Sequence, residues 1–304
     1  MSRFVRYEQF GGPEVLEVVD VEPPCPGPGE VRVRVLSAGL NPVDFKIFRG
    51  TPAAEAYGAS LPSGVGNDFS GIIDEIGDGV TAWTPGDEVL GGLRHFAMAD
   101  FVIVAASGAL IRKPAALDFD TAGALSIAGR TAWASVGAIA PTPADSVLVS
   151  AAAGGVGVLA AQLALRAGAS VIGTAGESNQ DFLRSLGVTP LLYGPGLADR
   201  IRQVAPGGVT AVLDNHGSET VALALELGVR PERINTIAAH GISGVQTVGG
   251  AAAGLSELER IARMLSEGEI VLPIDSVFPI ERVGEAYERL EAGHVCGKVV
   301  VVTE

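Results

Sequence analysis

The sequence predicts an α/β protein of two domains, in which a barrel-like β domain is followed by a domain with a doubly wound parallel sheet. The chain has 304 residues, about twice the length of a typical domain. Short strand patterns dominate up to about residue 118, and strand and helix patterns alternate after it. We therefore expect one domain at 1–118, completed by the tail at 273–304, and a second domain at 119–272.

The first domain is predicted from short apolar segments. Residues 31–35 alternate valine with Arg32 and Arg34, which is the period of a strand with one buried face. Turn signals at Asp78-Gly79 and Pro85-Gly86 separate further strand patterns. This spacing is typical of a compact β domain with few helices. The further strands are expected at 71–73, 88–90 and 101–104.

The second domain is predicted from a strand-helix-strand unit. A strand at 146–151 precedes a helix whose apolar positions from Val156 to Ala167 follow the spacing of one buried face. Gly168 is expected to end that helix as its C′ residue, and a parallel strand at 171–174 should follow with a right-handed crossover. Further strands are expected at 211–214 and 233–238, with helices at 180–186 and 256–267. In the tail we expect a helix at 283–290 and a strand at 298–302, folded back onto the first domain.

Composition and charge exclude several classes of partner. The formal net charge of −14 repels polyanions and acidic membrane surfaces, so nucleic acid and membrane are not expected as ligands. Residues 146–165 carry no charge and are long enough to span a bilayer, but they read as a strand, a glycine turn and a helix. With Cys25 and Cys296 as the only cysteines and no signal-peptide pattern, we expect a cytoplasmic protein.

A glycine-rich motif marks the expected cofactor site. Ala152-Ala153-Gly154-Gly155-Val156-Gly157 is an A-x-G-x-x-G form of the dinucleotide fingerprint, placed between a predicted strand and a predicted helix. Gly154 would let the backbone approach a pyrophosphate at the helix N-terminus, and Gly157 would let the helix pack closely on the strand. The bland alternative is an ordinary tight turn.

Residues 151–157 together with Gln162-Leu163-Ala164 resemble the cofactor loop of the quinone oxidoreductases, the zeta-crystallin-like family of the medium-chain dehydrogenase/reductases. Other blocks resemble further motifs of that family in the same order along nearly the whole chain. These blocks are 10–16, 39–44, 61–66, 85–89 and 129–133.

The resemblance implies a GroES-like β-barrel catalytic domain, a Rossmann domain, a bound nicotinamide cofactor and a homodimer. It places Asn41 and Thr131 beside the nicotinamide and Tyr193 near the adenosine ribose. The catalytic candidates are Asn41, Tyr57 and Thr131. The remaining expected cofactor contacts follow the predicted strands: Ala153, Gly154, Gly155, Val156, Gly157, Thr174, Ser178, Asn179, Asn215, Ile237 and Ala238.

The chain departs from the zinc-dependent members of the superfamily. Asn41 stands where those enzymes place a cysteine, and Asn67 stands where they place a histidine; neither asparagine is a good zinc ligand. Two cysteines cannot form a four-thiolate site, and His95, His216, His240 and His294 show no ligand spacing. We therefore expect no zinc.

Several residues have two open interpretations. Asn41 could orient the cofactor amide or a substrate oxygen, or serve as a turn residue before Pro42. Tyr57 could donate a proton or pack as an aromatic. Arg130 could bind an acidic substrate group or cap a helix. Lys46, Arg49 and His216 could face the cleft or the cofactor, or lie in solvent.

NADP(H) is expected in preference to NAD(H). The strand after the glycine loop ends in Thr174-Ala175-Gly176 rather than the Asp or Glu that accepts from both ribose hydroxyls in NAD enzymes. Ser178 and Asn179 can donate to a 2′-phosphate, and Tyr193 falls where the family has a tyrosine. Glu177 opposes this preference, and Arg184 is the cation considered for the phosphate.

The predicted function is hydride transfer from the nicotinamide to a quinone or an α,β-unsaturated carbonyl, catalysed by positioning and by fixed dipoles. Two alternatives stay open. The chain could bind the cofactor in a structural or sensory role with little turnover, or it could perform a non-redox biosynthetic step such as a cyclisation, because a fold does not fix a function.

Overall fold

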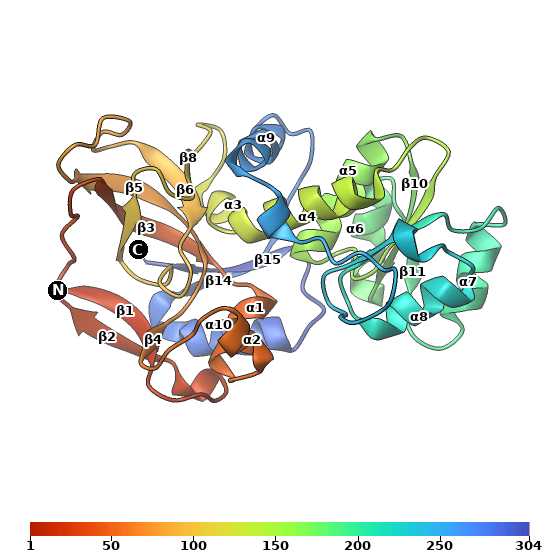
Figure 1. Cartoon of the computed structure of the whole chain (residues 1–304), viewed down its shortest axis with the longest axis horizontal. Coiled ribbons are helices and arrows are strands. Elements are labelled where there is room, and N and C mark those ends of the chain that lie inside the picture. The colour runs from red at the N-terminus through yellow and green to blue at the C-terminus, as the bar shows by residue number, and fades with distance from the viewer. Residues whose placement is uncertain (304) are drawn as a thin grey trace. The chain divides into compact units, whose positions relative to one another are not determined.

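The computed structural model describes residues 1–303, which form two compact units (Figure 1). Unit 1 comprises Met1–Ile127, Leu258–Glu269 and the described residues from Pro273 on, and unit 2 comprises Ala128–Glu257 and Ile270–Leu272. The sequence division placed 119–127 and 258–269 in the second domain, whereas their contacts group them with unit 1.

Unit 1 is built on β-sheets. Its larger sheet has seven strands in the order β14-β15-β3-β5-β6-β8, with β7 paired to β3. A smaller sheet has the order β2-β1-β4. The strands of the larger sheet are β3 (Glu30–Gly39), β5 (Asp68–Ile76), β6 (Glu88–Gly92), β7 (Phe101–Ala105), β8 (Leu110–Arg112), β14 (Ile274–Pro279) and β15 (Lys298–Val302), and those of the smaller one are β1 (Ser2–Tyr7), β2 (Glu17–Val21) and β4 (Ser63–Gly64).

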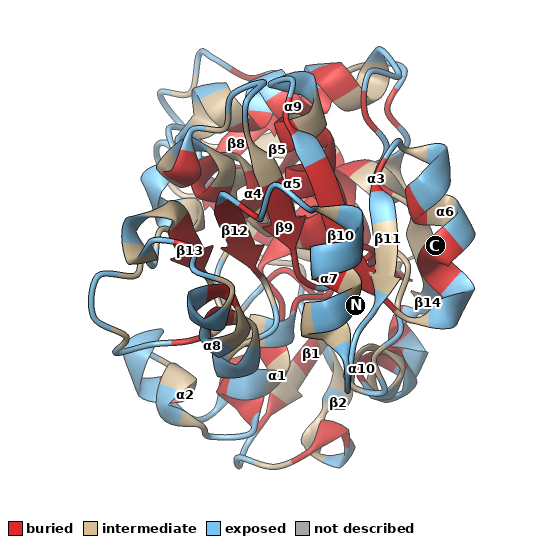
Figure 2. Ribbon diagram, turned by 90° about the vertical axis from the view of Figure 1, so that its right-hand side faces the viewer, coloured by how far each residue is buried: buried red, intermediate tan, exposed pale blue. Residues whose placement is uncertain are grey.

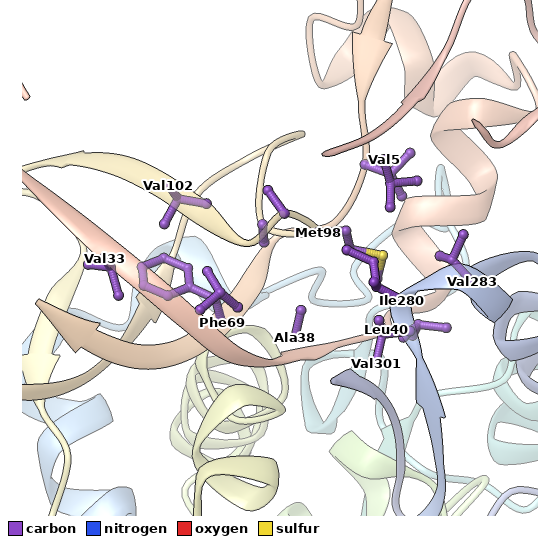
Figure 3. Packing of buried hydrophobic residues seen from close by; sticks show 14 of the residues in the cluster. Val5, Val33, Ala38, Leu40, Phe69, Met98, Val102, Ile280, Val283 and Val301 are labelled. Carbon is purple, nitrogen blue, oxygen red and sulfur yellow. The ribbon is translucent and has the colours of Figure 1, made fainter. Parts of the chain in front are cut away.

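The alternation read in β3 is confirmed. Val31, Val33 and Val35 are fully buried, while Arg32 and Arg34 on the opposite face are partly exposed. The valine face contributes to one apolar cluster that also includes Phe69 of β5, Met98 and residues of the tail (Figure 3). The strands expected at 71–73, 88–90 and 101–104 are confirmed within β5, β6 and β7.

The tail is part of unit 1. β15 pairs antiparallel with β3 through Val300↔Gly39 and parallel with β14, and α10 (Val283–Glu291) packs on both tail strands. Before residue 124 this unit has three short α-helices, α1 (Pro42–Phe48), α2 (Pro52–Ala56) and α3 (Phe119–Gly123), and a 3-10 helix at Pro13–Val15. A Cβ on Gly39 would lie 2.5 Å from the Cα of Ala124. The C-terminal end of α3 therefore lies directly against β3, in agreement with its place in unit 1.

Unit 2 contains a five-stranded parallel sheet in the order β11-β10-β9-β12-β13 (Figure 2). The chain first moves outward from β9 through β10 to β11 and then returns to the other side of β9. With right-handed crossovers, this reversal places helices on both faces, as a doubly wound sheet requires. The strands are β9 (Ser146–Val149), β10 (Ser170–Ala175), β11 (Thr189–Leu192), β12 (Ala211–Asp214) and β13 (Ile234–Thr236).

The expected strand-helix-strand unit is confirmed. Helix α5 (Gly155–Arg166) packs against β9 and β10, and Gly168 follows its last turn with φ of +91°, a conformation that favours glycine. The strand expected at 233–238 is too long, because pairing to β12 spans only Ile234 to Thr236 in β13. The α-helices between residues 124 and 272 are α4 (Ser126–Ile139), α5 (Gly155–Arg166), α6 (Gln180–Ser185), α7 (Leu197–Val204), α8 (Ser218–Glu226) and α9 (Leu255–Ser266). From Leu258 on, α9 groups with unit 1.

The uncharged segment 146–165 forms β9, the glycine turn and most of α5. In the described part of the chain, no helix has the length and apolarity needed to cross a membrane.

Candidate functional site

The glycine loop lies at the carboxyl end of β9, where the order of the parallel sheet reverses. β9 pairs with β10 on one side and with β12 on the other. Helix α5 begins directly after the loop, with Gly154 as an extended N-cap at φ −76° and ψ 168° and with no side chain capping it. The N–H groups of its first turn, Gly155 to Gly157, therefore have no side-chain partner and can bind an anion.

Gly154 and Gly157 are required for different reasons. A Cβ on Gly154 would meet only the carbonyl oxygen of Ala151, at 3.4 Å, so the space above this residue is open. A Cβ on Gly157 would lie 2.9 Å from the Cα of Ala152 and closer still to the Ala151 carbonyl. The first glycine leaves room for a ligand, and the second lets α5 pack against the end of β9.

Asp214 ties the ends of neighbouring strands beside this loop. Its buried carboxylate accepts from Ser150 Oγ at 2.8 Å, from Thr236 Oγ1 at 2.6 Å and from the His216 N–H at 2.9 Å. Asn215 donates its own N–H to Ser150 Oγ and its side-chain amide to the Ser150 carbonyl. The loops after β9 and β12 are thereby fixed to each other.

Ile237 and Ala238 lie at the same edge of the sheet. The Ile237 N–H donates to the Asp214 carbonyl at 3.0 Å, and the Ala238 N–H donates to Thr236 Oγ1 at 3.2 Å. The structure thus brings together, at one edge, the expected residues Ala153 to Gly157, Asn215, Ile237 and Ala238. The anchoring role of Asp214 was missed, although its place after a predicted strand and before Asn215 was a usable signal.

The residues expected near the ribose follow β10 and β11. Thr174 is buried, and its Oγ1 accepts from the Ala151 N–H at 3.3 Å. Glu177 and Ser178 are exposed in a 3-10 turn (Glu177–Asn179), whereas Asn179 is buried. Ala175 pairs with Leu192, so Tyr193 emerges at the same edge of the sheet as this turn.

The arginine that reaches the loop around Tyr193 is Arg200, whereas Arg184 was the cation considered from the sequence. Arg184 forms an exposed ion pair with Asp181 within α6. Arg200 of α7 instead reaches the loop around Tyr193: it donates to the carbonyls of Leu192 at 2.8 Å and Pro195 at 2.9 Å. Sequence reasoning missed Arg200, because only the fold of α7 against β11 brings it beside Tyr193.

Thr131 and Arg130 lie on α4 beside residues 250–253, which are part of the glycine-rich segment 241–254. A Cβ on Gly250 would lie 2.8 Å from Thr131 Oγ1, so the short 3-10 helix Gly250–Ala252 passes close to that hydroxyl. Arg130 Nε donates to the Ala253 carbonyl at 2.8 Å. Ala253 is the C-cap residue of that 3-10 helix, so of the two interpretations of Arg130 this contact supports the helix cap.

A buried polar cluster surrounds Asn41 in unit 1. The Asn41 side chain accepts from Lys298 Nζ at 2.6 Å and donates to Asp68 Oδ2 at 2.9 Å. Its amide also lies 3.4 Å from the Gly39 carbonyl. Asn41 is also the N-cap residue of α1. Its backbone therefore has the turn role expected before Pro42, while its side-chain amide bonds to charged groups.

Asp44 connects Asn41 and Asn67, the two positions at which we expect the chain to depart from the zinc-dependent enzymes. Its carboxylate accepts from the Asn41 N–H at 2.8 Å, from the Asn67 side-chain amide and from Tyr287 Oη at 3.1 Å. Burial raises the pKa of Asp44 to about 7, although the bonds from Asn41 and Asn67 oppose the shift. Burial likewise lowers the pKa of Lys298, and Asp68 and Asp44 counteract that change.

Tyr57 is the C-cap residue of α2 and is 40% exposed. The Arg94 guanidinium lies 4.7 Å from the centre of its ring, and His95 Nε2 lies 3.0 Å from its carbonyl oxygen. An exposed aromatic next to an arginine is open to a ligand as well as to solvent.

The other polar candidates have no contact that indicates a ligand. Arg49 pairs with Glu291 on the surface of unit 1, Lys46 is exposed on α1, and His216 is exposed after β12. These positions favour the solvent interpretation for the three residues.

The donor set around Asn41 does not fit zinc. Among residues 1–303, no group of three or more His, Cys, Asp or Glu side chains could hold a metal ion. The Asn41 backbone N–H and the Asn67 side-chain amide both donate to Asp44. The Lys298 ammonium donates to the side-chain oxygen of Asn41. A cation already present at that oxygen opposes a second one.

Two family descriptions match the chain. Residues 27–114 match the alcohol dehydrogenase GroES-like domain, and residues 186–301 match the family described as zinc-binding dehydrogenase. Among curated proteins, the chloroplast envelope quinone oxidoreductase homolog of Arabidopsis thaliana is 31% identical, covering 98% of this chain and 97% of its own. The quinone oxidoreductase of Homo sapiens is 29% identical, covering 99% and 98%.

Solved structures show the same likeness. The quinone oxidoreductase from Coxiella burnetii superposes with a TM-score of 0.87 at 29% identity, covering 100% of this chain and 99% of its own. The Escherichia coli quinone oxidoreductase complexed with NADPH gives 0.88 at 25% identity, covering 99% and 100%. The CurK enoyl reductase gives 0.86 at 26% identity, covering 99% of each chain.

Proposed function

Because the chain belongs to the quinone oxidoreductase family of the medium-chain dehydrogenase/reductases, we propose that it transfers a hydride from NADPH to a quinone or an α,β-unsaturated carbonyl. The E. coli relative complexed with NADPH and the CurK enoyl reductase support the cofactor and the two acceptor classes. An oxidoreductase of this family needs a dinucleotide site, and the chain's own geometry can be tested for one.

The glycine loop is the observation that carries the proposal. Gly154 leaves its space open, α5 starts without a side-chain cap, and both lie at the reversal of the parallel sheet. These features fit a pyrophosphate, which needs close backbone approach and unpaired N–H donors. Asp214 holds the neighbouring loop in register, so the edge is preorganised before a ligand binds.

The bound nicotinamide would supply the hydride, and the protein would position the reactants and stabilise charge. The Asn41 amide and the Thr131 hydroxyl are the neutral groups proposed to orient the cofactor amide or the acceptor oxygen. Tyr57, exposed beside Arg94, is proposed to deliver a proton to the reduced acceptor. We propose further that no zinc takes part, because Asn41 and Asn67 already form hydrogen bonds with Lys298 and Asp44.

We propose that Arg200 contributes to a preference for NADPH over NADH. Its donors hold carbonyls on both sides of Tyr193, which places positive charge beside the tyrosine. Ser178 and Tyr193 supply hydroxyls at the same edge of the sheet, and Glu177 is the acidic group that would favour NADH. A cationic group with hydroxyl donors fits a 2′-phosphate.

Steady-state oxidation of NADPH with a panel of acceptors tests the function. Quinones and enones should be reduced, while saturated ketones and alkenes without a carbonyl should not, since only the first two classes accept a hydride into a delocalised system. The same assay discriminates the two acceptor classes by their kcat/KM values. Tight NADPH binding without oxidation by any acceptor would instead support a binding or non-redox role.

A further inference from the structure

The side-chain amide of Asn41 is held between opposite charges. An ammonium can only donate, so Lys298 must face the amide oxygen, and an ionised carboxylate can only accept, so Asp68 must face the amide nitrogen. The two partners therefore exclude the flipped amide. Asn41 is only 3% exposed, so solvent has little access to loosen this arrangement.

Lys298 is buried where no surface role is possible. It lies at the start of β15 and is 5% exposed. Its Nζ donates to the Leu40 carbonyl at 2.7 Å and to Asn41 Oδ1 at 2.6 Å, and it lies 3.8 Å from Asp68 Oδ2. A buried ammonium is costly unless its hydrogen bonds are satisfied, and here both close bonds end on Asn41 or on the residue before it.

We propose that Lys298 is a positioning residue that, with Asp68, fixes the orientation of the Asn41 amide for hydride transfer. The catalytic part of this inference rests on the proposed function, whereas the clamping of the amide does not. With Oδ1 bound to Lys298 and one N–H bound to Asp68, the second N–H meets only the Gly39 carbonyl at 3.4 Å. The other two bonds fix the direction of this weakly held N–H, which is therefore the one available to a ligand oxygen.

Without the ammonium, the amide loses the donor to its oxygen. The Asn41 side chain could then rotate so that its N–H groups reach other acceptors, and Asp68 would be left without its neighbouring cation. We expect the loss of this orienting partner to lower kcat by roughly 10-fold to 100-fold, the range found for outer-shell partners that orient metal ligands.

Lys113 provides a matched control. It is also a buried lysine of unit 1, and its Nζ donates to the Leu117 carbonyl at 2.6 Å and pairs with Glu88 at 2.9 Å. It makes no contact with Asn41. Lys113→Met therefore removes a comparable buried ammonium and reports any general loss of stability. It leaves intact the clamp, by which we mean the hydrogen bonds of Lys298 and Asp68 to the Asn41 amide.

The first measurement is independent of turnover. In protein labelled with ¹⁵N-asparagine, the two Asn41 side-chain protons of the native chain should give separate signals that exchange slowly with water. In Lys298→Met they should exchange at least roughly 10-fold faster, while Lys113→Met leaves them unchanged. Lys298→Gln, a shorter and neutral donor, should be intermediate, and it serves if Lys298→Met does not fold. Unchanged Asn41 signals in the folded Lys298 variants would overturn the proposal.

The second measurement is a double-mutant cycle on kcat. Lys298→Met and Asn41→Ala should each lower kcat, and the double variant should be no slower than Asn41→Ala alone, because Lys298 acts through Asn41. KM for NADPH should change less than kcat. Additive losses would show that Lys298 acts independently and would contradict the proposal. If the native chain oxidises no cofactor, the proposed function fails while the exchange measurement still decides whether the clamp exists.

Discussion

A Cβ on Gly157 would lie 2.9 Å from the Cα of Ala152, so α5 can approach the end of β9 only because residue 157 lacks a side chain. Gly157→Val should therefore cost folding stability, by about 1–3 kcal/mol or more, as overpacking does. Gly154→Val should fold normally, since its backbone is extended and its surroundings are open, but it should lose NADPH binding. Thermal unfolding and fluorescence titration separate the two effects.

Gly137→Ala supplies the control for these substitutions. Gly137 lies in α4, and a Cβ there meets no atom within 4 Å. This variant should be as stable as the native chain or more stable by about 1 kcal/mol, because alanine favours a helix. Unchanged cofactor affinity in a folded Gly154→Val protein would show that the loop does not hold the pyrophosphate.

Removing the Arg200 charge should reduce the preference for NADPH. Arg200→Gln is expected to weaken NADPH binding roughly 10-fold, in keeping with one lost charged hydrogen bond, and to leave NADH binding nearly unchanged. Arg184→Gln is the matched control, because Arg184 pairs with Asp181 on the surface. Fluorescence titration with both cofactors measures the effect. A native chain that binds NADH more tightly, with that advantage lost in Glu177→Ala, would reverse the assignment.

The purified chain should contain no stoichiometric zinc, and chelators should not change its activity. The expectation follows from the ammonium of Lys298 at the Asn41 oxygen and from the engagement of Asn67 with Asp44. Elemental analysis and an activity assay after dialysis against chelator provide the measurement. About one zinc per chain, with activity lost on its removal, would contradict the expectation.

Asp44 should make the protein less stable as the pH rises from about 4 to 7. Its pKa is raised from 3.8 to about 7, so the folded state holds a proton that the unfolded state has released. Each pH unit in this interval costs about 1.4 kcal/mol, at most about 4 kcal/mol in total. Asp145, whose pKa is lowered to about 2, adds no slope above pH 5 or so.

Chemical denaturation at several pH values measures this slope. Asp44→Asn should show a flatter dependence than the native chain between about pH 5 and 7, since it removes the titrating group. Identical slopes for the two proteins would show that the Asp44 carboxyl is not protonated in the folded state at these pH values.

Strong periodic patterns predicted the fold, whereas tertiary contacts decided what the sequence did not reveal. The alternation in 31–35 and the apolar spacing from Val156 to Ala167 each report a single buried face, so β3 and α5 were predicted. β13 was predicted too long, because an apolar run does not reveal where pairing with a neighbouring strand stops. Residues 119–127 group with unit 1 because Gly39 and Gly123 allow close backbone approach, which spacing alone does not encode.

The site was predictable where chemistry depends on local sequence. The glycine loop combines strand, turn and helix within one segment, and its geometry follows from that segment. Lys298 and Asn41 are separated by 257 positions, and Arg200 reaches Tyr193 only through the packing of α7. Such contacts form only in the assembled fold, so no local sequence pattern predicts them.

The most direct test of the central claim is transfer of deuterium from NADPH deuterated at both C4 positions of the nicotinamide to an enone in a single turnover. We predict that the label appears on the β-carbon of the product, that one acceptor is reduced for each NADPH oxidised, and that Gly154→Val abolishes the transfer. A product without the label, or no oxidation of bound NADPH by any enone or quinone, would contradict hydride transfer as the function of this protein.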